Sequence, residues 1–132
     1  MTPSCSATDR PQEVAVGRAF AAALARRDFG EVATLLHPEI EFRALTPRRT
    51  FEPGSPDEVV DVVRLWFGTA EIEQVLAIDS DVVGDRPHVA YRFRGVRDGA
   101  PFVIEQQAYY EVRDGRLAWM RVVCSGFRPP AA

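Results

Sequence analysis

The fold is decided by residues 97–115, RDGAPFVIEQQAYYEVRDG, in which an Arg-Asp-Gly triplet stands at each end of an alternating segment. Asp-Gly is among the strongest short-range signals for a β-hairpin turn, because glycine adopts positive φ angles at little cost. Asp98-Gly99 and Asp114-Gly115 therefore predict two turns that join antiparallel strands. The sequence predicts a C-terminal meander of three strands, at residues 88–96, 101–112 and 116–127.

The N-terminal half predicts helices, because N-capping residues precede apolar side chains that recur at helical spacing. The predicted N-caps are Asp9, Asp28 and Ser55. The second helix is short and ends at His37-Pro38, whereas the third ends at Gly68. Further strands are predicted at residues 39–44 and 72–83, with a loop at 45–54. Helices first and a curved sheet last indicate an α+β fold shaped as a cone.

Length and composition indicate one ordinary soluble domain. The chain has 132 residues, 46% apolar and 27% charged, and residues 9–127 are predicted to form one domain between a disordered tail at 1–8 and a C-terminal tail at 128–132. A net charge of −3 with scattered arginines argues against a nucleic-acid-binding face. No apolar run approaches the ~20 residues of a membrane span, and the start has no signal-peptide core. Cys5 and Cys124 are too few for a disulfide framework, so we expect reduced thiols and a cytoplasmic protein.

Two parts of the chain resemble a known family. They are ARRDF at 25–29 followed by LLHPEIEF at 35–42, and YEVRDGRLAWMRV at 110–122. Over nearly its whole length the chain is similar to the NTF2-like (cystatin-like) superfamily, in the branch of ketosteroid isomerases and SnoaL-like polyketide cyclases. The resemblance implies three N-terminal helices packed on a curved, mainly antiparallel sheet. It also implies a deep apolar pocket for a small hydrophobic ligand, and a homodimer.

Strand alternation assigns side chains to the inside of this cone. On the central strand of the meander the more apolar face contains Phe102, Ile104, Gln106, Ala108, Tyr110 and Val112. The inward residues of the strand before it are Val89, Tyr91 and Phe93, and those of the first long strand are Leu76, Ile78, Ser80 and Val82. For the last strand alternation alone is ambiguous. A three-residue turn at 113–115, with Gly115 in a bulge, would turn inward Ala118, Met120, Val122 and Cys124, in agreement with the family.

The resemblance also implies where ketosteroid isomerase chemistry would be performed. Phe20 stands where those enzymes have a tyrosine donor, Phe42 where they have an aspartate base, and Ala108 where they have a protonated aspartate. Phenylalanine and alanine neither accept a proton nor donate a hydrogen bond, so that mechanism is rejected. The Asp-Arg-Asp arrangement of the epoxide-hydrolase branch and the inward aspartate of SnoaL-like cyclases have no counterpart on the inward faces of the four long strands.

The polar side chains left on the inward faces are the candidate catalytic residues Tyr91, Tyr110 and Gln106. Two hydroxyls and an amide can orient a carbonyl or hydroxyl group on an apolar ligand. Alternatively, each hydroxyl bonds to the backbone and the rings only pack. The predicted ligand-binding residues are Phe20, Phe42, Trp66, Phe93, Ala108, Met120, Val122 and Cys124.

No cofactor and no metal are predicted. His37 is expected to end a helix and His88 to be an exposed strand residue. Two separated histidines without a matching carboxylate or thiolate cluster do not indicate a metal site. Cys124 is expected to be a small buried side chain rather than a nucleophile, because neither histidine is placed to act as its base.

Two regions leave the interior open to other interpretations. A one-residue bulge beside Phe42 would turn Glu41 or Arg43 inward. The loop that follows contains Arg48-Arg49 at the expected mouth of the pocket. This pair either steers an anionic ligand, such as a carboxylate or a carrier-bound acyl group, or is ordinary solvated charge.

Three functional hypotheses follow. The first is an enzyme that cyclises, isomerises or dehydrates a hydrophobic, ring-containing metabolite, with Tyr91, Tyr110 and Gln106 acting together with ordered water. The second is a binding protein of the same fold without turnover. The third is a dimerisation or docking module that uses the outer face of the sheet around Tyr109, Trp119 and Val123.

Overall fold

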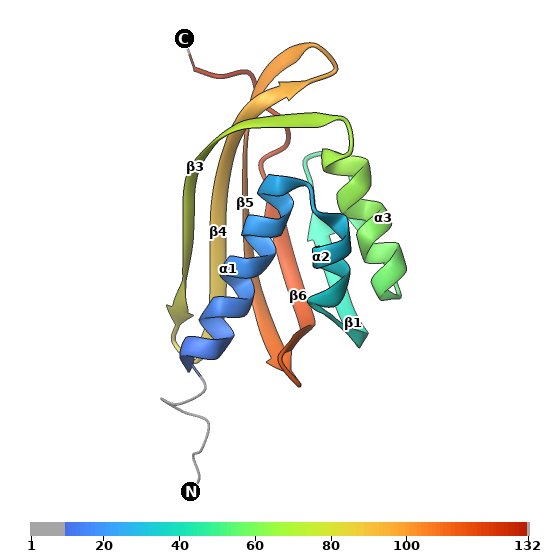
Figure 1. Ribbon diagram of the computed structural model, residues 1–132, viewed down its shortest axis with the longest axis vertical. Coiled ribbons are helices and arrows are strands. Elements are labelled where there is room, and N and C mark those ends of the chain that lie inside the picture. Colours follow the sequence, from blue (N-terminus) through green and yellow to red (C-terminus); the bar gives the residue numbers. More distant parts are fainter. Residues whose placement is uncertain (1–9, 132) are drawn as a thin grey trace, which may run out of the picture.

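Three helices pack on one side of a curved six-stranded sheet in the computed structural model, which describes residues 10–131 (Figure 1). The helices are α1 (Arg10–Arg26), α2 (Phe29–Thr34) and α3 (Pro56–Phe67). The strands are β1 (Leu36–Leu45), β2 (Thr50–Phe51), β3 (Ala70–Val83), β4 (Arg86–Arg97), β5 (Ala100–Arg113) and β6 (Arg116–Cys124). The predicted α+β class, with helices first and a meander last, is confirmed.

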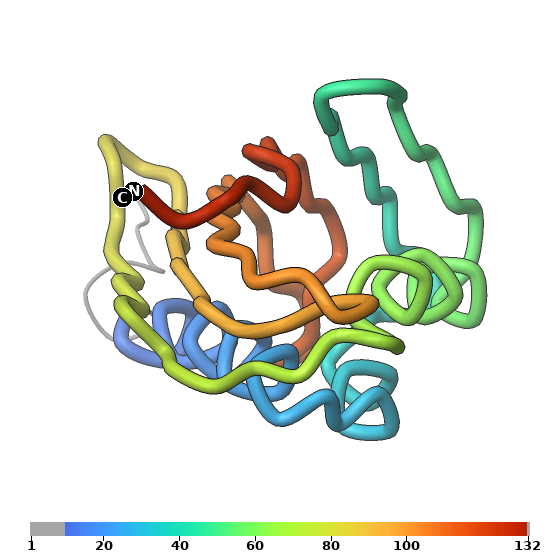
Figure 2. Tube along the Cα trace, turned by 90° about the horizontal axis from the view of Figure 1, so that it is seen from above, coloured from blue at the N-terminus to red at the C-terminus, as the bar shows by residue number. Residues whose placement is uncertain are grey.

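The sheet has the strand order β2-β1-β6-β5-β4-β3. Neighbouring strands are antiparallel except β1 and β6, which run parallel. The last strand, β6, thus lies between β1 and β5. Seen from above, the sheet is an open curve with the helices gathered on one side (Figure 2). Apolar side chains from both layers fill the space between them and form one core. Among residues 10–131, no helix combines the length and the apolar character that crossing a membrane requires.

Both Asp-Gly turns form, and each is a two-residue turn. Asp98 and Gly99 have φ angles of 52° and 81°, and Asp114 and Gly115 have 57° and 75°. Positive φ at both positions is the type I′ geometry, which matches the twist of the strands it joins. The predicted three-residue turn at 113–115 is therefore wrong.

The bulge expected at Gly115 lies instead at Ala118, between the pairs Glu111–Trp119 and Val112–Leu117. It shifts the register of β6 by one residue, so Leu117 is buried in place of Ala118. Beyond the bulge the predicted register is confirmed, since the buried residues there are Met120, Val122 and Cys124.

A second bulge corrects the prediction for β3. Leu76 was expected to face the interior, but its side chain is 41% exposed. It lies between the pairs Val75–Phe93 and Ala77–Arg92, where the register with β4 shifts. Past this point Ile78 packs against the core, as alternation predicts.

The helix caps are confirmed where the structure describes them. Asp28 accepts a hydrogen bond from the Glu31 N–H at 3.0 Å, and Ser55 accepts one from the Glu58 N–H at 3.2 Å. The third predicted cap, Asp9, and the predicted tail at 1–8 lie outside the described residues. Orphan N–H groups at a helix start are satisfied in this way, which explains why both helices begin where the sequence indicates.

Two segments differ from the prediction of loop and tail. Residues 45–54, expected to be a loop, contain β2, which pairs with Ala44 and Leu45. The last strand ends at Cys124 rather than at residue 127, and the chain then reverses at Gly126, whose φ angle is 82°. Arg128, placed in the C-terminal tail by the sequence, exchanges two backbone hydrogen bonds with Val103, of 2.8 and 2.9 Å. The returning chain thereby closes over one end of the core.

Candidate functional site

Tyr91 and Gln106 face each other across β4 and β5 inside the cone. They are paired residues in the strand register, and the Tyr91 hydroxyl donates a hydrogen bond to Oε1 of Gln106. Both side chains are almost fully buried, at 2% and 1% exposure. Nε2 of Gln106 has no hydrogen-bond partner among residues 10–131. Burying an amide N–H without an acceptor is unfavourable, so this group is an unsatisfied hydrogen-bond donor.

Tyr91 serves as a donor rather than a base. Burial, together with the neighbouring Cys124 thiol, raises the pKa of Tyr91 well above its ordinary value of 10.0. The hydroxyl therefore stays protonated at neutral pH and keeps its hydrogen bond to Gln106. The orientation of the amide is fixed by this bond, because Oε1 is occupied and Nε2 points the other way.

Tyr110, the third candidate, is not brought to the same place. It lies four residues from Gln106 along β5, or about 13 Å at the rise of a strand. Its hydroxyl donates to the carbonyl oxygen of Glu13 in α1 at 2.7 Å and lies 3.5 Å from Oγ of Ser80. Burial raises the pKa of Tyr110 as well. Its hydrogen bonds attach α1 to the sheet, and a catalytic role for it remains only a prediction.

A cavity of about 430 Å³ opens at the mouth of the cone. It lies between the β1–β2 loop, α3, the end of β4 and the returning C-terminal chain, and is lined by Thr46, Pro47, Arg48, Arg49, Phe51, Leu65, Trp66, Arg97, Cys124, Gly126, Phe127 and Arg128. Of the predicted ligand-binding residues, Trp66 and Cys124 line it. Cys124 is the register partner of Gln106, so the buried Tyr91–Gln106 pair lies next to a lining residue without itself lining the cavity.

The other predicted ligand-binding residues lie deeper. They are fully packed in the hydrophobic core and comprise Phe20, Phe42, Phe93, Ala108, Met120 and Val122. The deep pocket that the family resemblance implies is thus filled by this chain's own side chains, and the open space lies nearer the rim. Contact of these six residues with a ligand remains a prediction.

Aromatic rings connect the buried pair with the cavity. Tyr91 stacks on Phe93 with ring centroids 5.3 Å apart, and Phe93 lies edge-on to Phe67 at 6.1 Å. Phe67 in turn contacts Trp66 at 6.4 Å and Phe127 at 5.8 Å, and both of these line the cavity. Such edge-to-face pairs are the preferred geometry of packed aromatic rings. One side of the cavity is therefore a wall of closely packed aromatic rings.

The polar part of the lining is basic. It contains four arginines, Arg48, Arg49, Arg97 and Arg128, and no aspartate, glutamate or histidine. The sequence placed Arg48 and Arg49 at the mouth of the pocket. It missed Phe127 and Arg128, and with them the contact of Phe127 with Arg97, because the last strand was extended through Gly126. A glycine that interrupts a strand pattern signals a bend or reversal, and that signal was available.

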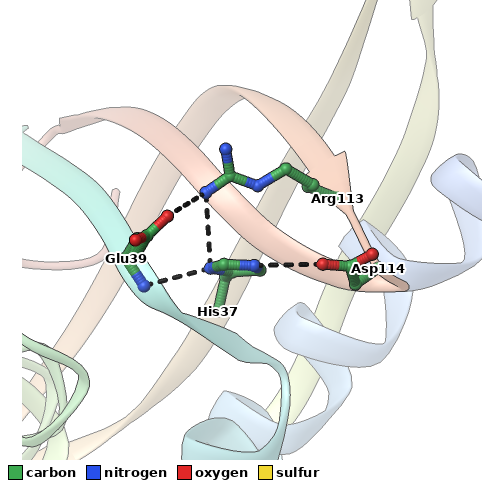
Figure 3. Close-up of polar contacts among 4 residues, drawn as sticks. All are labelled: His37, Glu39, Arg113 and Asp114. Carbon is green, nitrogen blue, oxygen red and sulfur yellow. Dashed lines mark hydrogen bonds and ion pairs between the residues drawn. The ribbon is translucent and has the colours of Figure 1, made fainter.

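A second polar cluster lies at the opposite end of β1 and joins it to the β5–β6 turn (Figure 3). Nδ1 of His37 accepts a hydrogen bond from the Glu39 N–H at 3.0 Å, and its Nε2 lies 3.3 Å from Oδ2 of Asp114. Nδ1 is an acceptor, so the proton is on Nε2 and is donated to Asp114. Arg113 pairs with Glu39 at 2.9 Å. The cluster holds strand ends in register rather than facing the cavity.

Both histidine predictions need correction. The helix α2 ends at Thr34, and His37 is a strand residue with 9% exposure. His88 is half-buried rather than exposed, with Asp81 and Gln107 each 3.2 Å from its two ring nitrogens. Within the described part of the chain, no group of three His, Cys, Asp or Glu side chains is close enough to hold a metal ion.

Replacing His37 with leucine is expected to lower the free energy of unfolding by about 1 kcal/mol, because the Glu39 N–H loses its acceptor in a partly buried place. Urea denaturation would measure the change. Asp114→Asn is the control and should leave the free energy of unfolding nearly unchanged. Asparagine tolerates the positive φ angle of the turn, and Asp114 is exposed. A His37→Leu protein as stable as the parent would exclude this structural role.

Comparison with known proteins agrees with this architecture. The model of the SnoaL-like domain family matches residues 17–120. The fold is similar to a candidate isomerase from Bacillus subtilis, with a TM-score of 0.73, 16% identity and 87% of each chain covered. It is also similar to a candidate polyketide cyclase from Xanthomonas campestris pv. campestris, with a TM-score of 0.70, 16% identity and coverage of 87% of this chain and 91% of that chain.

An LEH-like epoxide hydrolase from M. tuberculosis is similar too, with a TM-score of 0.66, 16% identity and coverage of 89% of this chain and 85% of that chain. No curated protein matches the chain significantly. At these identities the structural likeness shows the fold, and it confirms the NTF2-like architecture. Because the family model extends from α1 into β6 and the fold agrees with it, the chain belongs to the SnoaL-like domain family.

Proposed function

We propose that this chain binds a hydrophobic, ring-containing metabolite at the mouth of the cone and cyclises, isomerises or dehydrates it without the ketosteroid isomerase residues. One observation carries the proposal. The amide of Gln106, a buried donor without a described partner, is held by Tyr91 beside an aromatic-walled cavity of about 430 Å³. This volume lies within the range of small-molecule sites.

The proposed chemistry is the polarisation of a ligand carbonyl. A carbonyl oxygen that enters past Cys124 would accept the Nε2–H of Gln106, and negative charge that develops on that oxygen would be stabilised. Tyr91 strengthens the donor, because its hydroxyl withdraws electron density through Oε1. The cavity folds the ligand and excludes most water, while a bound water molecule carries the proton between ligand atoms.

The structural relatives support this reaction class. Two of them carry the names of a candidate isomerase and a candidate polyketide cyclase. When isomerisation or cyclisation occurs next to a carbonyl group, it passes through an enolate-like species, which a hydrogen-bond donor at the carbonyl oxygen stabilises. The donor at Gln106 would fulfil this requirement in the present chain.

A binding protein without turnover is the second candidate. It is favoured by the absence of carboxylate and imidazole groups from the described lining of the cavity, because these are the usual general bases. We also propose a cytoplasmic location and a homodimer. The exposed side chains of Tyr109 and Val123 on the outer face of the sheet support the latter.

Gln106→Leu distinguishes the two candidates, once a thermal-shift screen of polyketide, steroid and terpenoid compounds has identified a ligand. A ligand at a hundred times its Kd stabilises the fold by ~2.7 kcal/mol, which a melting curve detects. For an enzyme we expect kcat to fall at least tenfold with little change in KM, because the donor acts mainly on the developing charge.

Gln107→Leu is the matched control, since it makes the same change on the next residue of β5, whose side chain is exposed on the outer face. It should leave both kinetic constants unchanged. If Gln106→Leu weakens binding and no compound is turned over by the parent protein, the binding protein is the correct assignment. Turnover that Gln106→Leu does not affect would exclude this amide from the chemistry.

A further inference from the structure

We propose that the ligand of this cavity is an anion, a ring-containing acid whose carboxylate or equivalent oxyanion pairs with the guanidinium of Arg97. This inference rests on the proposed function, because it concerns the ligand of the same cavity. It specifies the ligand's charge and assigns its acidic group to one side chain.

The first argument is the charge of the lining. Four arginines and no acidic residue line the cavity, in a chain whose net charge is −3. Some arginines elsewhere in the described structure have a carboxylate partner, as in Arg86–Glu111, Arg92–Glu105 and Arg113–Glu39, and others on the surface have none. No ion pair with a described residue forms at any of the four cavity arginines. Their charges are therefore uncompensated, and a partly enclosed wall of one sign attracts the opposite charge.

The second argument is that Arg97 is held in place without an anion. Its guanidinium carbon lies 4.2 Å from the centroid of the Phe127 ring. That ring is itself fixed against Phe102 at 4.9 Å and by the hydrogen-bonded return of the chain at Arg128. A guanidinium stacked on an aromatic face keeps its N–H edges free, and this planar fork matches a carboxylate. The adjacent carboxylate, Asp98, forms no ion pair with it in the described structure.

The third argument is the kind of atom left unsatisfied. Within residues 10–131, the buried side-chain nitrogen and oxygen atoms without a hydrogen-bond partner are all donors. Two of them, Nε of Arg97 and Nε1 of Trp66, belong to residues that line the cavity, and a third, Nε2 of Gln106, belongs to the register partner of the lining residue Cys124. The fourth, Nη1 of Arg86, still lies 3.0 Å from a carboxylate oxygen of Glu111.

A ligand rich in acceptor oxygens satisfies these donors. A carboxylate at Arg97 and a carbonyl oxygen at Gln106 place the apolar ring between them, against Phe51, Leu65 and Phe127. Because buried donors without acceptors are unfavourable, each hydrogen bond formed with the ligand removes a cost that the free protein bears. The ligand class is thus a cyclic or aromatic keto acid rather than a neutral steroid-like molecule.

Two fluorescent probes with the same ring body test the charge. Anilinonaphthalene sulfonate is an anion, and N-phenylnaphthylamine is its neutral analogue without the sulfonate. We expect the full-length protein to bind the anion at one site and about tenfold more tightly than the neutral probe. The carboxylate naphthoate should displace anilinonaphthalene sulfonate from the site. Its neutral amide, naphthamide, should need about a tenfold higher concentration to do so.

Arg97→Gln is expected to abolish this preference while the affinity for the neutral probe stays the same. Arg94→Gln is the matched control, because Arg94 is an exposed residue of the same strand that lines no described part of the cavity, and it should keep the preference. The comparison of the two probes on the unmodified protein needs no variant, so it decides the question even if Arg97→Gln does not fold.

The outcomes separate the two proposals. Equal binding of both probes by the unmodified protein, or an unchanged preference in Arg97→Gln, would overturn the anionic ligand and leave the apolar cavity as a binding site. If neither probe binds at a defined site, the cavity does not accept ring-shaped ligands and the proposed function falls together with this inference.

Discussion

Replacing Phe67 with alanine is expected to lower the free energy of unfolding by about 3–5 kcal/mol, the largest single effect that we predict for this fold. Phe67 ends α3 and is completely buried. Its ring contacts Phe93, Trp66 and Phe127, so its removal leaves a void that several rings border and cannot fill together. Equilibrium unfolding in urea, followed by fluorescence and circular dichroism, would measure the loss.

Leu65→Ala is the control for Phe67→Ala. Leu65 belongs to the same helix, but it is 58% exposed, and its truncation should change the free energy of unfolding by less than about 1 kcal/mol. Similar losses for the two variants would mean that the aromatic cluster between core and cavity does not carry the stability assigned to it.

Gly17→Ala is expected to destabilise the protein by about 2–3 kcal/mol, although alanine favours helices over glycine. Gly17 is buried in α1, at the point where the helix crosses the side chain of Tyr110. A Cβ atom built on Gly17 would overlap the hydroxyl and the ring of Tyr110, and that ring is fixed by its hydrogen bond to Glu13. The helix would have to move away from the sheet.

Gly30→Ala provides the matched comparison. Gly30 is also a helical glycine, but a Cβ atom there would meet only Oδ1 of Asp28 at 3.7 Å, an ordinary contact. This variant should be as stable as the parent or more stable by up to about 1 kcal/mol. In a Tyr110→Leu background the cost of Gly17→Ala should shrink, because the two residues share one contact. An undiminished cost would locate the clash elsewhere.

The elements could be predicted because their signals are local. The positive φ angles at Asp98 and Asp114, and the N-caps at Asp28 and Ser55, depend on residues within four positions. The bulges at Leu76 and Ala118 could not be found in this way. A β-bulge has no signature in the types of residue that form it. Its position depends on which side chains pack better against the neighbouring strand.

The candidate site was predicted in part. Alternation correctly placed Tyr91, Gln106 and Tyr110 on the inward face. It does not show whether residues on one face are close enough to act on the same ligand, and Tyr110 is too far along β5 from the other two. The Arg48-Arg49 loop was expected at the mouth of the pocket, but the opposite wall of the cavity was missed, because it depends on a reversal at Gly126 that brings Phe127 and Arg97 together. Contacts between residues thirty positions apart arise from the packed structure and have no local pattern.

The central position of β6 has a consequence for synthesis of the chain. Ribosomes deliver residues in order, so the five strands β1 to β5 emerge before β6, the strand that joins β1 to β5. Until then β1 and β5 each present an unpaired edge, and such edges invite pairing with other chains. Pairs such as Phe42 with Met120 also close a very long loop, which slows folding. A nascent chain stopped after β5 should therefore depend on chaperones and aggregate when they are withdrawn.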